Sequence, residues 1–205
     1  MEREKRTSLL ILILYLTITM AVILFSIYSQ KETALSSPEI MQNATYAVIL
    51  AATFIFMRIS RKSLREIGLF HHDFRRQIVT GIIIAIIFLI IWGILFGLGN
   101  SPKGNLLYLV LSQFLVALTE ELMFRGYILS ILEDIVQTPN RAVFISALLF
   151  GLWHYPATHN IPLVLITFLT GAIYSTLRIV FRETDDEISV FSITIAHWAF
   201  NVIST

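Results

Sequence analysis

Long apolar stretches separated by short polar segments run through the whole chain. We interpret seven of them as candidate membrane spans, although the fifth and seventh are short or polar for a span of about 20 apolar residues. Each is predicted to be a helix, because a segment in lipid must satisfy its backbone hydrogen bonds internally. The predicted spans are Ser8–Tyr28, Glu39–Met57, Ile78–Leu98, Leu106–Leu132, Ala142–Tyr155, Ile161–Leu177 and Ile188–Thr205.

The composition agrees with a membrane protein. Only 14% of the 205 residues are charged, whereas soluble domains carry about 25% charged residues. We therefore predict an all-α, polytopic membrane helical bundle that forms a single integral membrane domain over residues 1–205. The chain has no cysteine, which excludes disulfides, thiolate metal sites and cysteine catalysis. Its basic residues lie in loops between apolar stretches, so the net charge of +1 does not indicate a nucleic-acid partner.

The distribution of basic residues predicts an orientation. With the N-terminus in the cytoplasm, twelve of the fifteen Lys and Arg residues fall on the cytoplasmic side, two fall outside and Arg125 lies within a span. Cytoplasmic loops are typically enriched in positive charge. The first apolar stretch is too long for a signal peptide and has no small-residue cleavage site after it. We therefore expect a multi-pass protein with a cytoplasmic N-terminus, and its short length and lack of a targeting peptide are compatible with a bacterial cell membrane.

Polar residues inside the predicted spans point to a functional site. Ionisable groups at membrane depth are costly, and they usually serve a function. A polar clamp between helices is the structural alternative, but such bonds contribute only about 1 kcal/mol each, and neutral side chains would serve with less desolvation. The set lies in the fourth, fifth and seventh spans and comprises Glu120, Glu121, Arg125, His154, His197 and Asn201.

The spacing of these residues indicates how they pair. Glu121 and Arg125 are separated by four positions, so they share a helix face and are predicted to form an ion pair. Glu120 points about 100° away, and its neighbour four positions on is Phe124. Its partner must therefore come from another span, and His154 and His197 are the candidates. We expect these groups to converge with Asn201 on one cavity below the cytosolic surface.

Three short motifs in this half of the chain resemble a known family. EELMFRG at residues 120–126 matches the EExxxR motif of the CPBP family, the CAAX proteases and bacteriocin-processing enzymes, also called Abi. FGLWH, which ends at His154, is similar to the second motif, FxxxH, and HWAFN, His197–Asn201, is similar to the third, HxxxN. All three occur in family order within residues 106–205. The chain thus resembles the type II CAAX prenyl endopeptidases among these intramembrane proteases.

This resemblance implies an endopeptidase that hydrolyses a peptide bond of a membrane-associated peptide or protein. By the same resemblance, Glu120 and His154 hold and activate the attacking water, and His197 and Asn201 stabilise the oxyanion. Glu121 and Arg125 support the site, and we expect them to position the Glu120 backbone. We expect no cofactor. If the enzyme is instead zinc-dependent, the ligands would be Glu120, His154 and His197, a His₂Glu set.

Two other functions remain open from the sequence. A non-catalytic membrane immunity or scaffold protein, of the bacteriocin-immunity type, would need no intact motif set, and the complete set argues against it. A proton-coupled transporter could use Glu120 and the histidines as a relay, but the chain shows no inverted repeat. The expected partners are the lipid bilayer and a peptide or protein substrate at the membrane, without nucleic acid.

Overall fold

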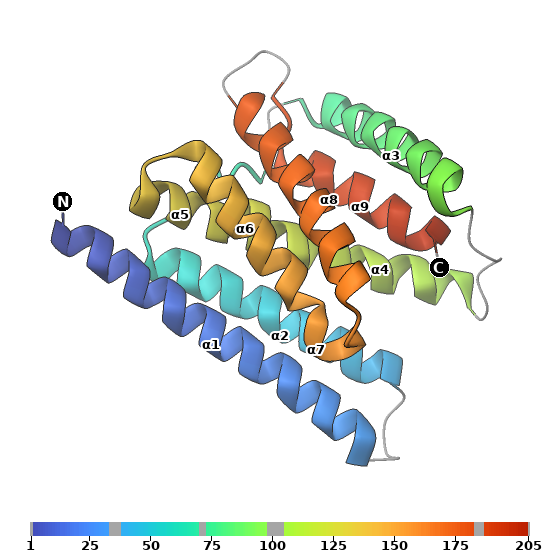
Figure 1. Cartoon of the computed structure of the whole chain (residues 1–205), viewed down its shortest axis with the longest axis horizontal. Coiled ribbons are helices and arrows are strands. Elements are labelled where there is room, and N and C mark those ends of the chain that lie inside the picture. Colours follow the sequence, from blue (N-terminus) through green and yellow to red (C-terminus); the bar gives the residue numbers. More distant parts are fainter. Residues whose placement is uncertain (1, 33–37, 70–72, 98–104, 183–186, 205) are drawn as a thin grey trace.

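The computed structural model describes residues 2–32, 38–69, 73–97, 105–182 and 187–204 (Figure 1). Within these residues every regular element is helical, so the prediction of an all-α bundle is confirmed. The elements are α1 (Glu2–Glu32), α2 (Pro38–Ile59), α3 (Phe74–Phe96), α4 (Leu106–Glu121), η1 (Leu122–Ile128), α5 (Leu129–Val136), α6 (Pro139–Trp153), α7 (Tyr155–Thr158), α8 (Ile161–Val180) and α9 (Val190–Ser204).

Five helical segments are long and apolar enough to cross a membrane, which makes the chain a multi-pass membrane protein. They are α1, α2, α3, α8 and the continuous segment formed by α4, η1 and α5. The remaining two predicted spans correspond to α6 and α9, with 15 residues each. At about 1.5 Å of rise per residue such a helix is roughly 22 Å long, shorter than the ~30 Å hydrocarbon core of a bilayer. All seven predicted spans are therefore helical, and five of them are long enough to cross alone.

Several predicted boundaries differ from the structure. The fourth span continues past Leu132 to Val136. The fifth span is not one helix, because α6 ends at Trp153 and the four-residue α7 starts at Tyr155. Pro156 lies in the first turn of α7, where proline favours a new helix start because its missing N–H is not needed there. Leu98 and Thr205, the predicted ends of the third and seventh spans, lie outside the described residues.

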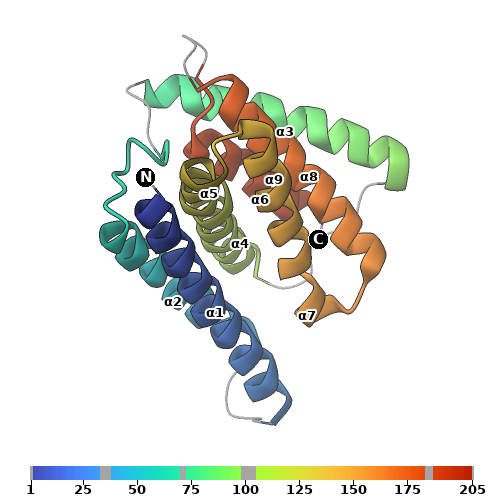
Figure 2. The same cartoon turned by 60° about the vertical axis from the view of Figure 1, so that its left-hand side comes forward.

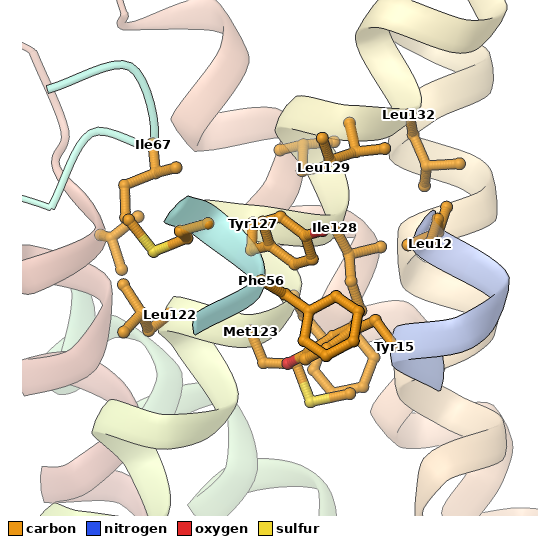
Figure 3. Packing of buried hydrophobic residues seen from close by; sticks show 14 of the residues in the cluster. Leu12, Tyr15, Phe56, Ile67, Leu122, Met123, Tyr127, Ile128, Leu129 and Leu132 are labelled. Carbon is orange, nitrogen blue, oxygen red and sulfur yellow. The ribbon is translucent and has the colours of Figure 1, made fainter. Parts of the chain in front are cut away.

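The segment α4–η1–α5 lies at the centre of the bundle (Figures 1 and 2). The long helices α1 and α2 pack side by side on one flank, and α3, α8 and α9 lie on the other. The main hydrophobic core forms where α1 and α2 meet η1 and α5. Figure 3 shows Tyr15, Phe56 and Met123 packed together within this core. The bundle therefore holds the middle of the fourth predicted span in its most buried position.

Helix α3 illustrates the lipid-facing surface. Its large side chains are mostly exposed, for example Ile83, Ile87 and Ile94. Its inner face packs closely on α9, where a Cβ at Gly81 would lie 2.6 Å from the Ser192 carbonyl oxygen. Small residues of this kind let membrane helices approach each other, so α3 fixes α9 in place while exposing an apolar face.

The loops predicted to share the cytoplasmic side lie together at one end of the bundle. Lys62, after α2, forms an ion pair with Asp134 on α5 at 2.7 Å. Arg182, after α8, pairs with Glu133 at 2.7 Å. These contacts agree with the predicted succession of spans, and the orientation of that end in the cell remains a prediction.

Candidate active site

The candidate site is built around a π-helix. After Glu120 and Glu121 close α4, residues Leu122–Ile128 form η1, and all seven are buried. Hydrogen bonds in a π-helix join residues five apart, and such segments occur frequently at functional sites. The sequence predicted an uninterrupted α-helix here. The π-helix contacts α2, α6, α8 and α9, so residues at this turn can reach side chains from four other helices.

Glu121 and Arg125 lie opposite each other across this turn. Arg125 Nη1 is 3.1 Å from Glu121 Oε1, and both side chains have no exposed surface. The Arg125 guanidinium also lies 4.0 Å from the ring centre of Phe150 and 5.5 Å from that of Tyr174. Within the described residues its nitrogens have no aligned hydrogen-bond partner. The ion pair with Glu121 and the two aromatic rings therefore offset part of the free-energy cost of burying this cation.

Side chains from three other parts of the bundle lie around the Glu120 carboxylate. Tyr46 of α2 donates a hydrogen bond of 2.7 Å to Glu120 Oε1. The other oxygen, Oε2, faces two imidazoles: His154 Nε2 at 3.9 Å and His197 Nε2 at 3.8 Å. Glu120 thus meets both histidines that the sequence offered as partners, at distances longer than a direct hydrogen bond.

The hydrogen bonds of the two imidazoles define which ring nitrogen faces Glu120. His154 Nδ1 lies 2.9 Å from the Phe150 carbonyl oxygen, and His197 Nδ1 lies 2.7 Å from Glu121 Oε1. Both partners can only accept, so each Nδ1 carries a proton and donates it. In a neutral ring the Nε2 atom then holds a lone pair. Two imidazole lone pairs and one carboxylate oxygen therefore converge, and a molecule or ion that carries protons or positive charge fits between them.

Glu121 differs from its expected role. The sequence predicted that the Glu121–Arg125 pair would position the Glu120 backbone, whereas the structure also places the Glu121 carboxylate against the His197 ring. Glu121 therefore orients a histidine as well as neutralising Arg125. Nothing in the spacing indicated this contact, because His197 lies on a distant helix.

The cluster combines two acidic side chains, two imidazoles and one guanidinium. Buried charge in a membrane protein is costly unless it is compensated, so the close contacts among these groups offset part of that cost.

The site lies near the middle of the bundle. Glu120 has about 21 Å of helix before it in the Leu106–Val136 segment and about 24 Å after it, at 1.5 Å per residue. The position of the site relative to the cytosolic surface remains a prediction. Asn201 is partly buried on α9, one turn after His197. The imidazoles are more exposed than the acid, with side-chain exposures of 23% for His154, 12% for His197 and 3% for Glu120.

Tyr46 is the site residue that the sequence interpretation missed. It lies in an apolar part of the second span, where an aromatic residue is expected to pack or to anchor the helix. The sequence pattern indicated only the two histidines as partners for Glu120. A buried carboxylate needs hydrogen-bond donors for both oxygens. This requirement is the signal that could have indicated a tyrosine hydroxyl from another span.

The zinc alternative can be compared with this geometry. Two imidazole nitrogens and a carboxylate oxygen match the donor types of a His₂Glu site. Ligands of a tetrahedral zinc with bonds of about 2.0–2.1 Å lie roughly 3.3 Å apart, whereas both Nε2–Oε2 distances here are 3.8 Å or longer. Among the described residues, no group of three or more potential ligands has the geometry to hold a metal ion. The donor types of this set therefore match a zinc site, and the metal requirement remains a prediction.

Fold and site together define a multi-pass helical membrane protein with a buried acid and two imidazoles facing one point, an arrangement suited to hydrolysis. Comparison with protein families agrees: residues 102–203, about half of the chain, match the family described as type II CAAX prenyl endopeptidase Rce1-like. The chain belongs to this family, which makes it a membrane protease by class. No curated protein matches the chain.

Proposed function

We propose that the protein is an intramembrane endopeptidase that uses Glu120 and His154 to activate a water molecule. The observation that carries this proposal is the convergence of Glu120 Oε2 with His154 Nε2 and His197 Nε2, at 3.9 and 3.8 Å. A water molecule between these atoms would lie within hydrogen-bond reach of a general base, which is the first requirement of acid–base catalysis.

The water attacks the carbonyl carbon of the scissile peptide and gives a proton to Glu120 Oε2 as the new C–O bond forms. The tetrahedral intermediate collapses when the C–N bond breaks, and Glu120 passes that proton to the leaving amine. His154 accepts a hydrogen bond from the water through Nε2 and orients it. Its ring is held for this role by the hydrogen bond from Nδ1 to the Phe150 carbonyl oxygen.

His197 stabilises the oxyanion in this mechanism. When its ring carries a proton on both nitrogens, Nε2 donates to the developing oxyanion, and Glu121 stabilises the positive charge through its contact with Nδ1. Preorganised donors of this kind are often the largest contribution to catalysis. Asn201, on the next turn of α9, supplies a second donor through its amide.

The substrate is a peptide or protein at the membrane. A direct test uses the purified full-length chain in lipid nanodiscs and an internally quenched peptide with a prenylated cysteine four residues from its C-terminus. Comparative peptidomics of membranes that contain wild-type protein or the Glu120→Ala variant extends the test to other substrates. Products that appear only with the wild type support the proposal, and their absence from both experiments contradicts it.

Zinc independence is a prediction of this mechanism. Dialysis against EDTA or 1,10-phenanthroline should leave peptide cleavage within about twofold of the untreated rate, because in the proposed mechanism the proton transfers use only side chains of this chain. Elemental analysis of the same samples should give well under one zinc per chain. Loss of activity that added zinc restores, together with about one zinc per chain, would favour the ligand set Glu120, His154 and His197.

A further inference from the structure

A residue of the second span reaches the candidate site from outside the segment that defines the family. Tyr46 of α2 precedes the matched residues 102–203, yet its hydroxyl lies 2.7 Å from Glu120 Oε1. Glu120 is almost fully buried, and this bond accounts for one of its two oxygens. The three family motifs contain no residue that takes this position.

The direction of this hydrogen bond is fixed by its surroundings. A tyrosine hydroxyl keeps its proton at neutral pH, and an ionised carboxylate can only accept. The Tyr46 hydroxyl therefore donates to Glu120 Oε1.

The backbone of α2 is also tied to the acidic turn. The Thr119 hydroxyl donates to the Tyr46 carbonyl oxygen at 3.4 Å. Tyr46 is therefore held at its backbone by the residue before Glu120 and at its side chain by Glu120 itself. A ring anchored in this way restricts the rotation of the Glu120 carboxylate.

We propose that Tyr46 is a positioning residue for the general base Glu120, an inference that rests on the proposed function. By occupying Oε1, it leaves Oε2 as the oxygen that faces both imidazole Nε2 atoms and receives the proton from water. Without the hydroxyl, the carboxylate can rotate, and the oxygen that accepts the proton is no longer held against the histidines. The effect acts on the chemical step and not on substrate binding.

The test variant is Tyr46→Phe, which removes the hydroxyl and keeps the ring. In nanodiscs with the prenylated quenched peptide, kcat should fall about tenfold to hundredfold, the range seen when second-layer partners of active-site ligands are removed. KM should stay within about twofold, because the hydroxyl bonds to the general base Glu120 and its proposed effect is on the chemical step. An unchanged kcat, or an equal loss expressed mainly in KM, overturns the proposal.

Tyr15→Phe is the matched control. Tyr15 is fully buried on α1, and its hydroxyl makes a hydrogen bond of the same length, 2.7 Å, to Thr53 on α2. The variant removes the same chemical group from another interhelical contact of α2, away from the site. It should lower the thermal unfolding temperature and leave kcat within about twofold, and a parallel loss of kcat in both variants shows that loosening of α2 alone explains the effect.

A second measurement does not depend on any substrate. Tyr46→Phe should lower the thermal unfolding temperature in the wild-type background but not in the Glu120→Met background, where the acceptor is already missing. Equal decreases in both backgrounds overturn the contact. If the wild type cleaves no peptide, the proposed function fails while this comparison still decides the hydrogen bond; if the wild type cleaves and Tyr46→Phe equals it, the inference about Tyr46 fails.

Discussion

Replacing Glu120 by glutamine is expected to lower peptide cleavage about a thousandfold, near the detection limit of the quenched-peptide assay. Removal of a general base typically costs about 10²- to 10⁴-fold in rate. The amide keeps the shape of the side chain and can still accept from Tyr46, but it cannot take a proton from water. Its NH₂ group can also donate to His154 Nε2, which would occupy the lone pair that orients the water.

Glu133→Gln is the matched control for this variant. Glu133 belongs to the same membrane segment and pairs with Arg182 at 2.7 Å, away from the candidate site. Its neutralisation should leave kcat within about twofold. Cleavage by Glu120→Gln at the wild-type rate would contradict the mechanism, and survival of a cellular phenotype in this variant would favour the non-catalytic immunity or scaffold alternative.

Much of the fold could be predicted from the sequence because the membrane imposes a simple rule. All seven predicted spans are helical, and the pairing of Glu121 with Arg125 follows from their spacing. The predicted helix boundaries differ from the structure where local chemistry competes with hydropathy. Pro156 lies in the first turn of a new helix inside an apolar stretch. The lengths of α6 and α9 also could not be predicted, because the apolar sequence does not mark where each helix ends.

The meeting of Glu120 with His154 and His197 could be predicted from the sequence, but Tyr46 and the other contacts of the candidate site could not. Buried charge identified Glu120, His154 and His197 as neighbours, since each is expensive in lipid without a partner. The position of Tyr46 and the contact between Glu121 and His197 depend on how distant helices pack, and a single sequence holds no direct record of that packing. The π-helix at Leu122–Ile128 could not be predicted either, because hydropathy does not distinguish a π-helix from an α-helix within one apolar segment.

Replacing Arg125 by methionine is expected to produce the largest loss of stability among these variants. Methionine has a similar length and suits apolar surroundings, so the main change is the loss of the positive charge beside Glu121. Both side chains of this pair are fully buried, and removing one partner of a buried pair costs about 3–5 kcal/mol because the other charge stays uncompensated. For a chain of this size that corresponds to a decrease in unfolding temperature on the order of 10 °C, measurable by thermal unfolding in detergent.

The double variant Glu121→Gln/Arg125→Met separates charge from packing. Glutamine keeps an oxygen that can accept from His197 Nδ1, which lies 2.7 Å from Glu121 in the wild type. With neither charge present, no uncompensated ion remains, and at least half of the lost unfolding temperature should return. A double variant no more stable than Arg125→Met alone would show that the contacts of the guanidinium with Phe150 and Tyr174, and not the ion pair, make Arg125 necessary. A recovery would mean that the acidic turn tolerates two glutamates at mid-membrane depth because Arg125 compensates one of them and leaves the other free to act as a base.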